Sequence, residues 1–73
     1  MTVADALDKA GEEPRVLYDL ATVATAVGVA VRDLRAAAED GDMYAGKLSG
    51  GRRGTWYVRP EWVDKWIDEK VDA

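Results

Sequence analysis

The chain has 73 residues, of which 33% are charged and 48% are hydrophobic, and it contains neither cysteine nor histidine. This length leaves room for one domain with a modest core, and not for a site that encloses a large substrate. Because thiol and imidazole groups are absent, disulfides, cysteine or histidine catalysis and most zinc sites are excluded, and we expect neither an enzyme nor a cofactor. The apolar runs of the chain are far shorter than the ~20 residues that span a bilayer. The first residues are acidic, whereas a signal peptide begins with basic residues. We therefore expect a cytoplasmic protein without membrane contact.

The net charge of −4 is distributed unevenly along the chain. Residues 1–14 and residues 60–73 each carry −3, whereas residues 15–59 carry +2. Affinity for nucleic acid comes mainly from lysine and arginine side chains close to phosphates. The basic middle segment therefore keeps DNA binding open despite the overall acidity, and it predicts a weak non-specific attraction with strong salt sensitivity.

Residues 1–14 are predicted to form an N-terminal acidic helix or arm, followed by one domain over residues 15–73. Helix-forming residues precede a glycine stop at Gly11, and apolar side chains recur among them at helical spacing: Val3, Ala6, Leu7 and Ala10. This pattern leaves open whether the short helix docks on the domain or frays. Residues 15–18 are β-prone and predict either a short extended strand or a lead-in to the next helix.

Two short helices joined by a tight glycine turn are predicted next. Asp19 is a good N-cap for the first helix, which ends at Gly28 and has one buried stripe: Leu20, Val23, Ala24 and Val27. The second helix begins near Ala30 and ends at Gly41, with an inward face of Val31, Leu34, Ala37 and Ala38. Its outward face holds Arg32, Asp33, Arg35, Ala36 and Glu39. Such a pair is typical of a helix-turn-helix, although an αα-hairpin without a role in nucleic-acid binding fits the same pattern.

A glycine-rich loop with two arginines separates two β-prone stretches, residues 43–48 and 55–58. The glycines of the SGGRRG loop supply the backbone freedom of a hairpin. Alternation along the second strand places side chains in pairs on its two faces: Trp56 with Val58, and Tyr57 with Arg59. Arg52 and Arg53 either keep an exposed turn soluble or reach a phosphate or a narrow minor groove, and we favour the second interpretation.

A final helix is predicted to begin at Pro60, which suits a first helical turn. Its core stripe consists of Val63, Trp66 and Ile67. Trp62 lies beside that stripe, where it either packs at the edge of the domain or anchors a protein partner.

The order of these elements resembles the winged helix-turn-helix DNA-binding domain of the excisionase and MerR-like proteins. The resemblance covers about residues 17–67, in the stretches LYDLATVATAVGVA, VRDLRAAAEDGDMYAGKL and GGRRGTWYVRPEWVDKWI. It implies a mainly α fold with a small β-hairpin wing, whose second helix enters the major groove while the wing touches the adjacent backbone or minor groove. At the positions that match the family, the resemblance implies the following DNA-binding residues: Arg32, Arg35, Ala36, Lys47, Arg52, Arg53 and Arg59. Arg32 and Arg35 would contact guanine or clamp a phosphate.

The resemblance further implies a protein encoded by a phage or mobile element in a bacterial host cell. It would act on double-stranded DNA as an excisionase (a recombination directionality factor) or as a transcriptional regulator, with cooperative binding of neighbouring copies and an integrase as a further partner. Three positions differ from the family: Ala30 replaces a capping serine, Asp33 lies on the side that meets DNA, and Asp42 replaces a basic residue. With the overall acidity and Trp62, they leave a second interpretation open, a winged-helix adaptor that binds a host or phage protein rather than DNA.

Overall fold

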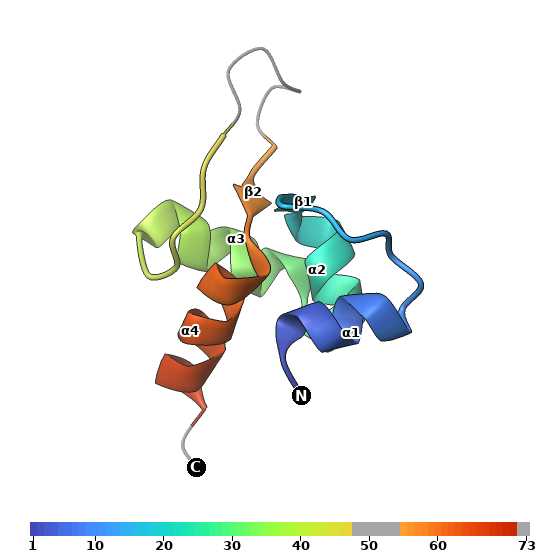
Figure 1. Cartoon of the computed structure of the whole chain (residues 1–73). Helices are drawn as coiled ribbons and strands as arrows, with labels where there is room; N and C mark the ends of the chain where they lie inside the picture. Colours follow the sequence, from blue (N-terminus) through green and yellow to red (C-terminus); the bar gives the residue numbers. More distant parts are fainter. Residues whose placement is uncertain (48–54, 72–73) are drawn as a thin grey trace.

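The computed structural model describes residues 1–47 and 55–71. In these residues the chain forms four helices and a two-stranded antiparallel sheet around one apolar core (Figure 1). The helices are α1 (Val3–Lys9), α2 (Leu20–Val27), α3 (Val31–Asp40) and α4 (Pro60–Lys70), and the strands are β1 (Tyr18–Asp19) and β2 (Tyr57–Val58). The mainly α character predicted from the sequence is confirmed. None of the helices in the described ranges is long and apolar enough to cross a membrane.

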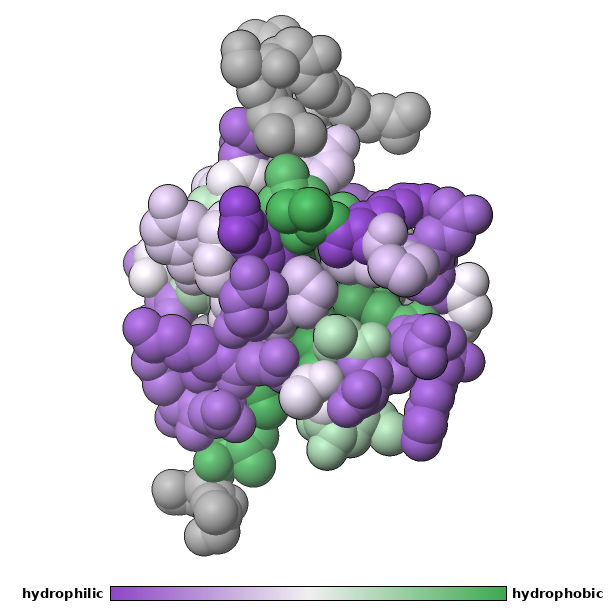
Figure 2. Space-filling view, viewed as in Figure 1, coloured by the Kyte–Doolittle hydropathy of each residue, from purple (hydrophilic) through white to green (hydrophobic). Residues whose placement is uncertain are grey.

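The core collects one buried stripe from each helix. Its most deeply buried side chains are at most 1% exposed and come from all four helices and β2: Leu7, Val23, Leu34, Val58 and Val63. Each such side chain contributes roughly 1.5–3 kcal/mol through removal from water. The stripes predicted for α2, α3 and α4 belong to this core, whereas the face of the molecule in Figure 2 is mostly hydrophilic, with hydrophobic surface in small separate areas.

Helix α1 docks against α2 and α4, which settles the choice between docking and fraying. Val3 is 2% exposed and lies in the common core. The first turn of α1 is capped by Thr2 and Asp5, and Asp64 of α4 accepts a hydrogen bond from the Val3 N–H at 2.8 Å. The Thr2 N–H donates to the Asp5 carboxylate, and this bond lowers the pKa of Asp5 below its ordinary value. The acidic N-terminal helix is therefore tied to the last helix through a hydrogen bond as well as apolar contacts.

Helices α2 and α3 begin and end close to the predicted residues. Asp19 caps α2 by accepting hydrogen bonds from the Thr22 N–H at 3.3 Å and the Thr22 hydroxyl at 2.6 Å. Gly28 and Gly41 end α2 and α3 with φ values of 78° and 80°. Only glycine adopts this left-handed conformation without steric cost, so both helix ends are encoded locally.

The strand predicted over residues 15–18 is wrong in extent, because the paired residues are Tyr18 and Asp19, opposite Val58 and Tyr57. The cause is the Tyr18 hydroxyl, which accepts a hydrogen bond from the Arg15 N–H and donates one to the Glu13 carbonyl, both at 2.9 Å. These bonds tie Glu13 and Arg15 to the Tyr18 side chain, and none of residues 15–17 is paired with β2.

The prediction of a strand over residues 43–48, the first strand of the hairpin, is also wrong for residues 43–47, the part that the structure describes. Only Gly46 pairs, through an isolated antiparallel bridge to Tyr57. The Met43 N–H instead donates to the Ala37 carbonyl at 3.1 Å, and the Met43 side chain is 2% exposed. The segment after α3 therefore closes that helix and fills the core before it reaches β2.

The start of α3 provides a stability test. Ala30 is the N-cap, with extended backbone angles (φ −65°, ψ 134°) and no side-chain capping bond. A serine at this position would accept a hydrogen bond from a free N–H of the first turn, which is worth about 1 kcal/mol. We expect Ala30→Ser to raise the Tm by about 4–8 °C in thermal unfolding followed by circular dichroism. Ala36→Ser, the same change at an exposed interior position of α3, is the control and should not raise the Tm. A melting temperature of Ala30→Ser at or below that of the wild type would contradict the assignment of residue 30 as an N-cap that lacks a capping bond.

Candidate nucleic-acid interface

Helix α3 presents an exposed face with two arginines in its N-terminal half. Arg32, Arg35 and Ala36 are exposed, and Arg35 and Ala36 follow Arg32 by three and four residues, so they share one face of the helix. Within residues 1–47 and 55–71, neither arginine forms an ion pair with a carboxylate. The structure thus brings together the three residues that the resemblance placed on the DNA-binding helix. Glu39 and Asp40 occupy the last turn, so positive charge is confined to the beginning of this face.

Next to this face lies an open hollow of about 540 Å³, called here the basic hollow, which is bordered by α2, α3 and β2. Arg35 of α3 lines it, together with Arg15 from the segment before β1, Trp56 just before β2 and Tyr57 of β2. Arg35 belongs both to the exposed face of α3 and to the hollow. The two features therefore form one continuous surface.

Lys47 is held beside the basic hollow by an aromatic ring. Its Nζ lies 4.7 Å from the centroid of the Trp56 ring, within range of a cation–π interaction. The preceding residue, Gly46, exchanges two backbone hydrogen bonds of 3.0 and 2.7 Å with Tyr57. Backbone pairing and the Trp56 ring together place the ammonium group at this surface. The sequence interpretation treated Trp56 only as a strand residue and missed this contact.

The charge around the basic hollow is positive, in contrast to the net charge of −4 of the whole chain. Arg15 and Arg35 line it and Lys47 contacts Trp56 of its lining, whereas Asp19 is the acidic residue of that lining. Both carboxylate oxygens of Asp19 already accept hydrogen bonds from Thr22 at the start of α2. The local excess of cations favours an anionic ligand such as a phosphate.

Arg15 is the residue of this surface that the sequence interpretation missed. The available signal was its place in the basic middle segment, directly ahead of a β-prone stretch. Nothing in that signal brings Arg15 near Arg35, which lies 20 residues further along the chain. The hydrogen bonds of the Tyr18 hydroxyl and the pairing of β1 with β2 bring the two together.

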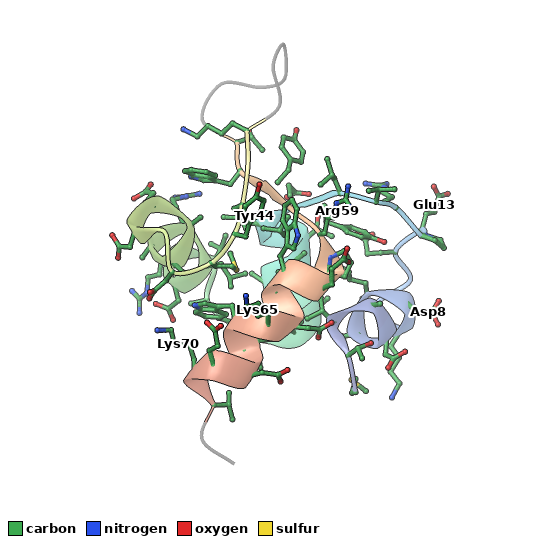
Figure 3. The ribbon with its side chains drawn as sticks, turned by 60° about the vertical axis from the view of Figure 1, so that its left-hand side comes forward. Asp8, Glu13, Tyr44, Arg59, Lys65 and Lys70 are labelled. Atoms are coloured by element: carbon green, nitrogen blue, oxygen red, sulfur yellow. The ribbon has the colours of Figure 1, made fainter. Side chains whose placement is uncertain are left out.

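Arg59, by contrast, does not lie at the basic hollow. Its guanidinium carbon is 5.6 Å from the centroid of the Trp62 ring, and one of its nitrogens is 3.8 Å from the Glu61 carboxylate. Figure 3 shows Arg59 close to Tyr44 at the beginning of α4. The structure thus separates Arg59 from the basic residues on α3.

The predicted loop arginines, Arg52 and Arg53, lie outside the described residues. The described chain stops at Lys47 and resumes at Thr55. Thr55 lines the basic hollow and Lys47 contacts Trp56 of its lining. Both ends of the described chain at this gap therefore lie at the candidate interface.

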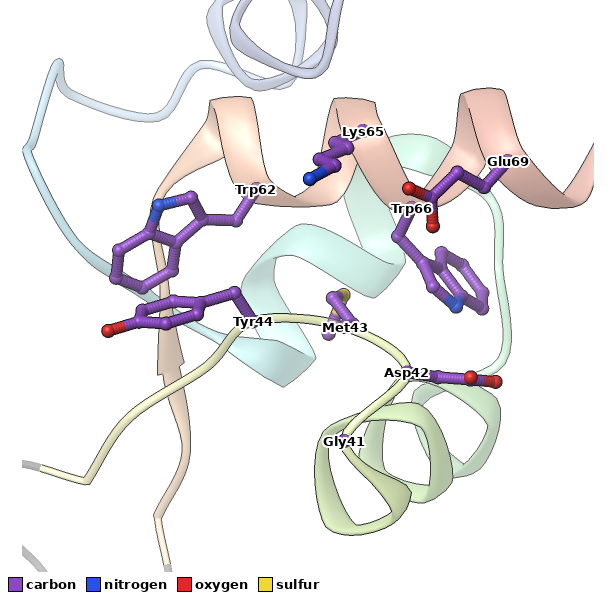
Figure 4. Close-up of a pocket in the computed structure, with 8 residues that line it drawn as sticks. All are labelled: Gly41, Asp42, Met43, Tyr44, Trp62, Lys65, Trp66 and Glu69. Carbon is purple, nitrogen blue, oxygen red and sulfur yellow. The ribbon is translucent and has the colours of Figure 1, made fainter.

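A second hollow, of about 560 Å³, separates α4 from the segment after α3 and is called here the aromatic hollow (Figure 4). The Tyr44 and Trp62 rings meet edge to face at one end of it, with centroids 4.4 Å apart, and Trp66 lies at the other end. Tyr44 is 71% exposed, and Trp62 is half-buried beside the core. The Trp66 Nε1 is buried without a hydrogen-bond partner among the described residues. The ion pair of Asp42 with Lys70, at 3.1 Å, joins the segment after α3 to the end of α4.

Comparison with protein-family models, with curated proteins and with solved structures finds no match to this chain. The candidate interface is therefore defined by the residues and geometry of the chain itself.

Proposed function

We propose that this chain is a small DNA-binding protein with a winged helix-turn-helix fold. The observation that carries the proposal is the continuous basic surface formed by the exposed face of α3 and the basic hollow. Arg32 and Arg35 stand on that face without carboxylate partners in the described part of the chain, and Arg15 and Lys47 extend the positive charge beyond the helix. Double-stranded DNA is the partner that matches an exposed helix with adjacent cations.

The charge distribution on α3 favours entry of its N-terminal half into the major groove. A helix of about 10–12 Å diameter fits a major groove of about 12 Å. The acidic last turn, with Glu39 and Asp40, would be repelled by phosphates if the helix lay along the groove over its whole length. Arg32 and Arg35 then reach base edges, where a guanidinium can bond the O6 and N7 atoms of guanine together. Asp33, on the same half of α3, is suited to accept a hydrogen bond from a cytosine amine.

The biological role we propose is that of an excisionase or a transcriptional regulator, encoded by a phage or mobile element and acting in the cytoplasm of a bacterial host. This part of the proposal is based on the resemblance over residues 17–67. Because the chain is acidic overall, a single copy binds DNA weakly. Neighbouring copies on one DNA, or an integrase bound beside them, would supply the remaining affinity.

The proposal is tested by selecting binding sites from random DNA duplexes at two salt concentrations. We expect a motif to be enriched, and we expect Arg35→Ala to reduce the preference for that motif about 5- to 150-fold, the loss that follows from one guanine contact of ~1–3 kcal/mol. If Arg32 contacts only phosphate, Arg32→Ala weakens binding equally on all duplexes and reduces the salt dependence by about one charge.

Lys9→Ala is the matched control, since it removes one positive charge from an exposed position on α1. It should leave both the motif and the affinity unchanged. A wild-type chain that enriches no motif and retains no duplex would contradict the proposed function. An Arg35→Ala variant that behaves like Lys9→Ala would show that the α3 face is not the reading surface.

A second candidate function, a protein-binding adaptor, is favoured by the aromatic hollow. Tyr44 remains largely exposed although it contacts Trp62, and Trp66 lies in the same hollow. Tryptophan and tyrosine at the edge of a pocket are the residues most enriched among binding hot spots. The partner in this case is a host or phage protein that binds without DNA.

This candidate is tested by affinity capture from nuclease-treated bacterial lysate. We expect a partner that is retained by the wild type and by Arg35→Ala but lost by Trp62→Ala. Truncation of a hot-spot side chain costs about 2 kcal/mol or more, which lowers the affinity at least about 30-fold. The thermal unfolding of Trp62→Ala is followed in parallel, so that loss of the partner is separated from loss of the fold. Identical protein sets from the wild type and Trp62→Ala would remove this candidate.

A further inference from the structure

We infer that Arg15 contacts a phosphodiester of the bound DNA from the basic hollow, and that the Tyr18 hydroxyl positions it there; the inference depends on the DNA binding proposed above. Its basis is a pair of hydrogen bonds outside the α3 face. Tyr18 is 5% exposed, and its ring lies in the core. Its hydroxyl accepts the Arg15 N–H and donates to the Glu13 carbonyl, both at 2.9 Å.

These two bonds tie the backbone on both sides of Pro14 to the Tyr18 side chain. Both hydrogen bonds are part-buried, and their loss would leave the hydroxyl of the largely buried Tyr18 without these partners. The Arg15 N–H is thus tied to Tyr18, and the residue is exposed between two hollows, the basic hollow and a smaller one that it lines with Asp8 and Glu12. Less conformational freedom is lost when a residue tied in this way binds a ligand than when a free loop is ordered.

Two cations line the basic hollow from separate segments, and a third lies over the ring of a tryptophan that lines it. Arg15 belongs to the segment before β1, Arg35 to α3, and Lys47 lies over the Trp56 ring beside β2. Like charges that converge without an anion repel one another, and a phosphate placed between them relieves that repulsion. The guanidinium of Arg15 is suited to two parallel hydrogen bonds with phosphate oxygens.

Duplex DNA brings such a phosphate to the hollow when α3 lies in the major groove, because Arg35 belongs to both surfaces. Arg15 is on the segment before β1 and not on the helix that reads the bases, so it contributes affinity that does not depend on sequence. Loss of Arg35 should therefore reduce the selectivity between DNA sequences, whereas loss of Arg15 should reduce the affinity for all sequences alike.

The experiment measures affinity by fluorescence anisotropy over a salt series, on the selected duplex and on a scrambled duplex of the same length. We expect Arg15→Ala to weaken binding about tenfold on both duplexes and to lower the slope of log affinity against log salt by about one. Arg15→Lys retains the charge and should keep the slope of the wild type. Lys9→Ala, with the same loss of charge at an exposed residue that is not part of the lining of the hollow, should match the wild type on both duplexes.

Tyr18→Phe tests the positioning role, because it removes only the hydroxyl. We expect it to weaken binding less than Arg15→Ala does, and to have no further effect when combined with Arg15→Ala. A purely structural role would lower affinity by the same factor in both backgrounds, and that result overturns the positioning role. If Tyr18→Phe fails to fold in circular dichroism, Arg15→Ala and Arg15→Lys decide the phosphate contact on their own.

The outcomes separate this inference from the proposed function. A wild-type chain that binds neither duplex overturns both. A wild-type chain that binds, with an Arg15→Ala variant whose affinity and salt slope equal those of Lys9→Ala, overturns the inference about Arg15 alone.

Discussion

The backbone pairing of Tyr18 with Val58 joins two parts of the chain that lie 40 residues apart, and the arrangement of the other elements depends on it. Both residues are buried, at 5% and 0% exposure, so this short sheet is part of the core. It brings the segment that carries Arg15 to β2, and β2 in turn pairs with Gly46 on its other side. Without it the basic hollow would lose the side that β2 provides.

The surface of α3 is poorly adapted to helix stability. Its N-cap is an alanine without a capping bond, and its last turn carries Glu39 and Asp40, where the negative end of the helix dipole favours basic residues. The helix is held instead by its buried stripe and by the left-handed glycine at its end. A helix held in this way can carry surface residues that serve an intermolecular contact, which agrees with the function proposed for Arg32 and Arg35.

The basic hollow and the aromatic hollow share no lining residue. The first lies between α2, α3 and β2, and the second lies between the segment after α3 and α4. Arg59 and Trp62 are associated with the second surface, so a variant at either residue leaves the cations of the first in place. The proposed DNA binding and the alternative protein binding can therefore be tested with separate sets of variants.

The sequence by itself determined the helices, because helix caps, glycine stops and apolar stripes depend on residues only a few positions apart. Asp19, Gly28 and Gly41 marked helix ends that the structure reproduces, and the shared face of Arg32 and Arg35 follows from helical periodicity alone. The contacts that depend on distant residues were decided by the tertiary structure.

Met43 was drawn into the core, which removed the strand expected there, and the Val3 N–H found its acceptor on Asp64 of α4. The Tyr18 hydroxyl placed Arg15 at the hollow, whereas Arg59 was directed to Trp62 instead. The physical reason is that burial and hydrogen-bond satisfaction choose among partners that lie far apart along the chain, and local residue patterns carry no information about those distances.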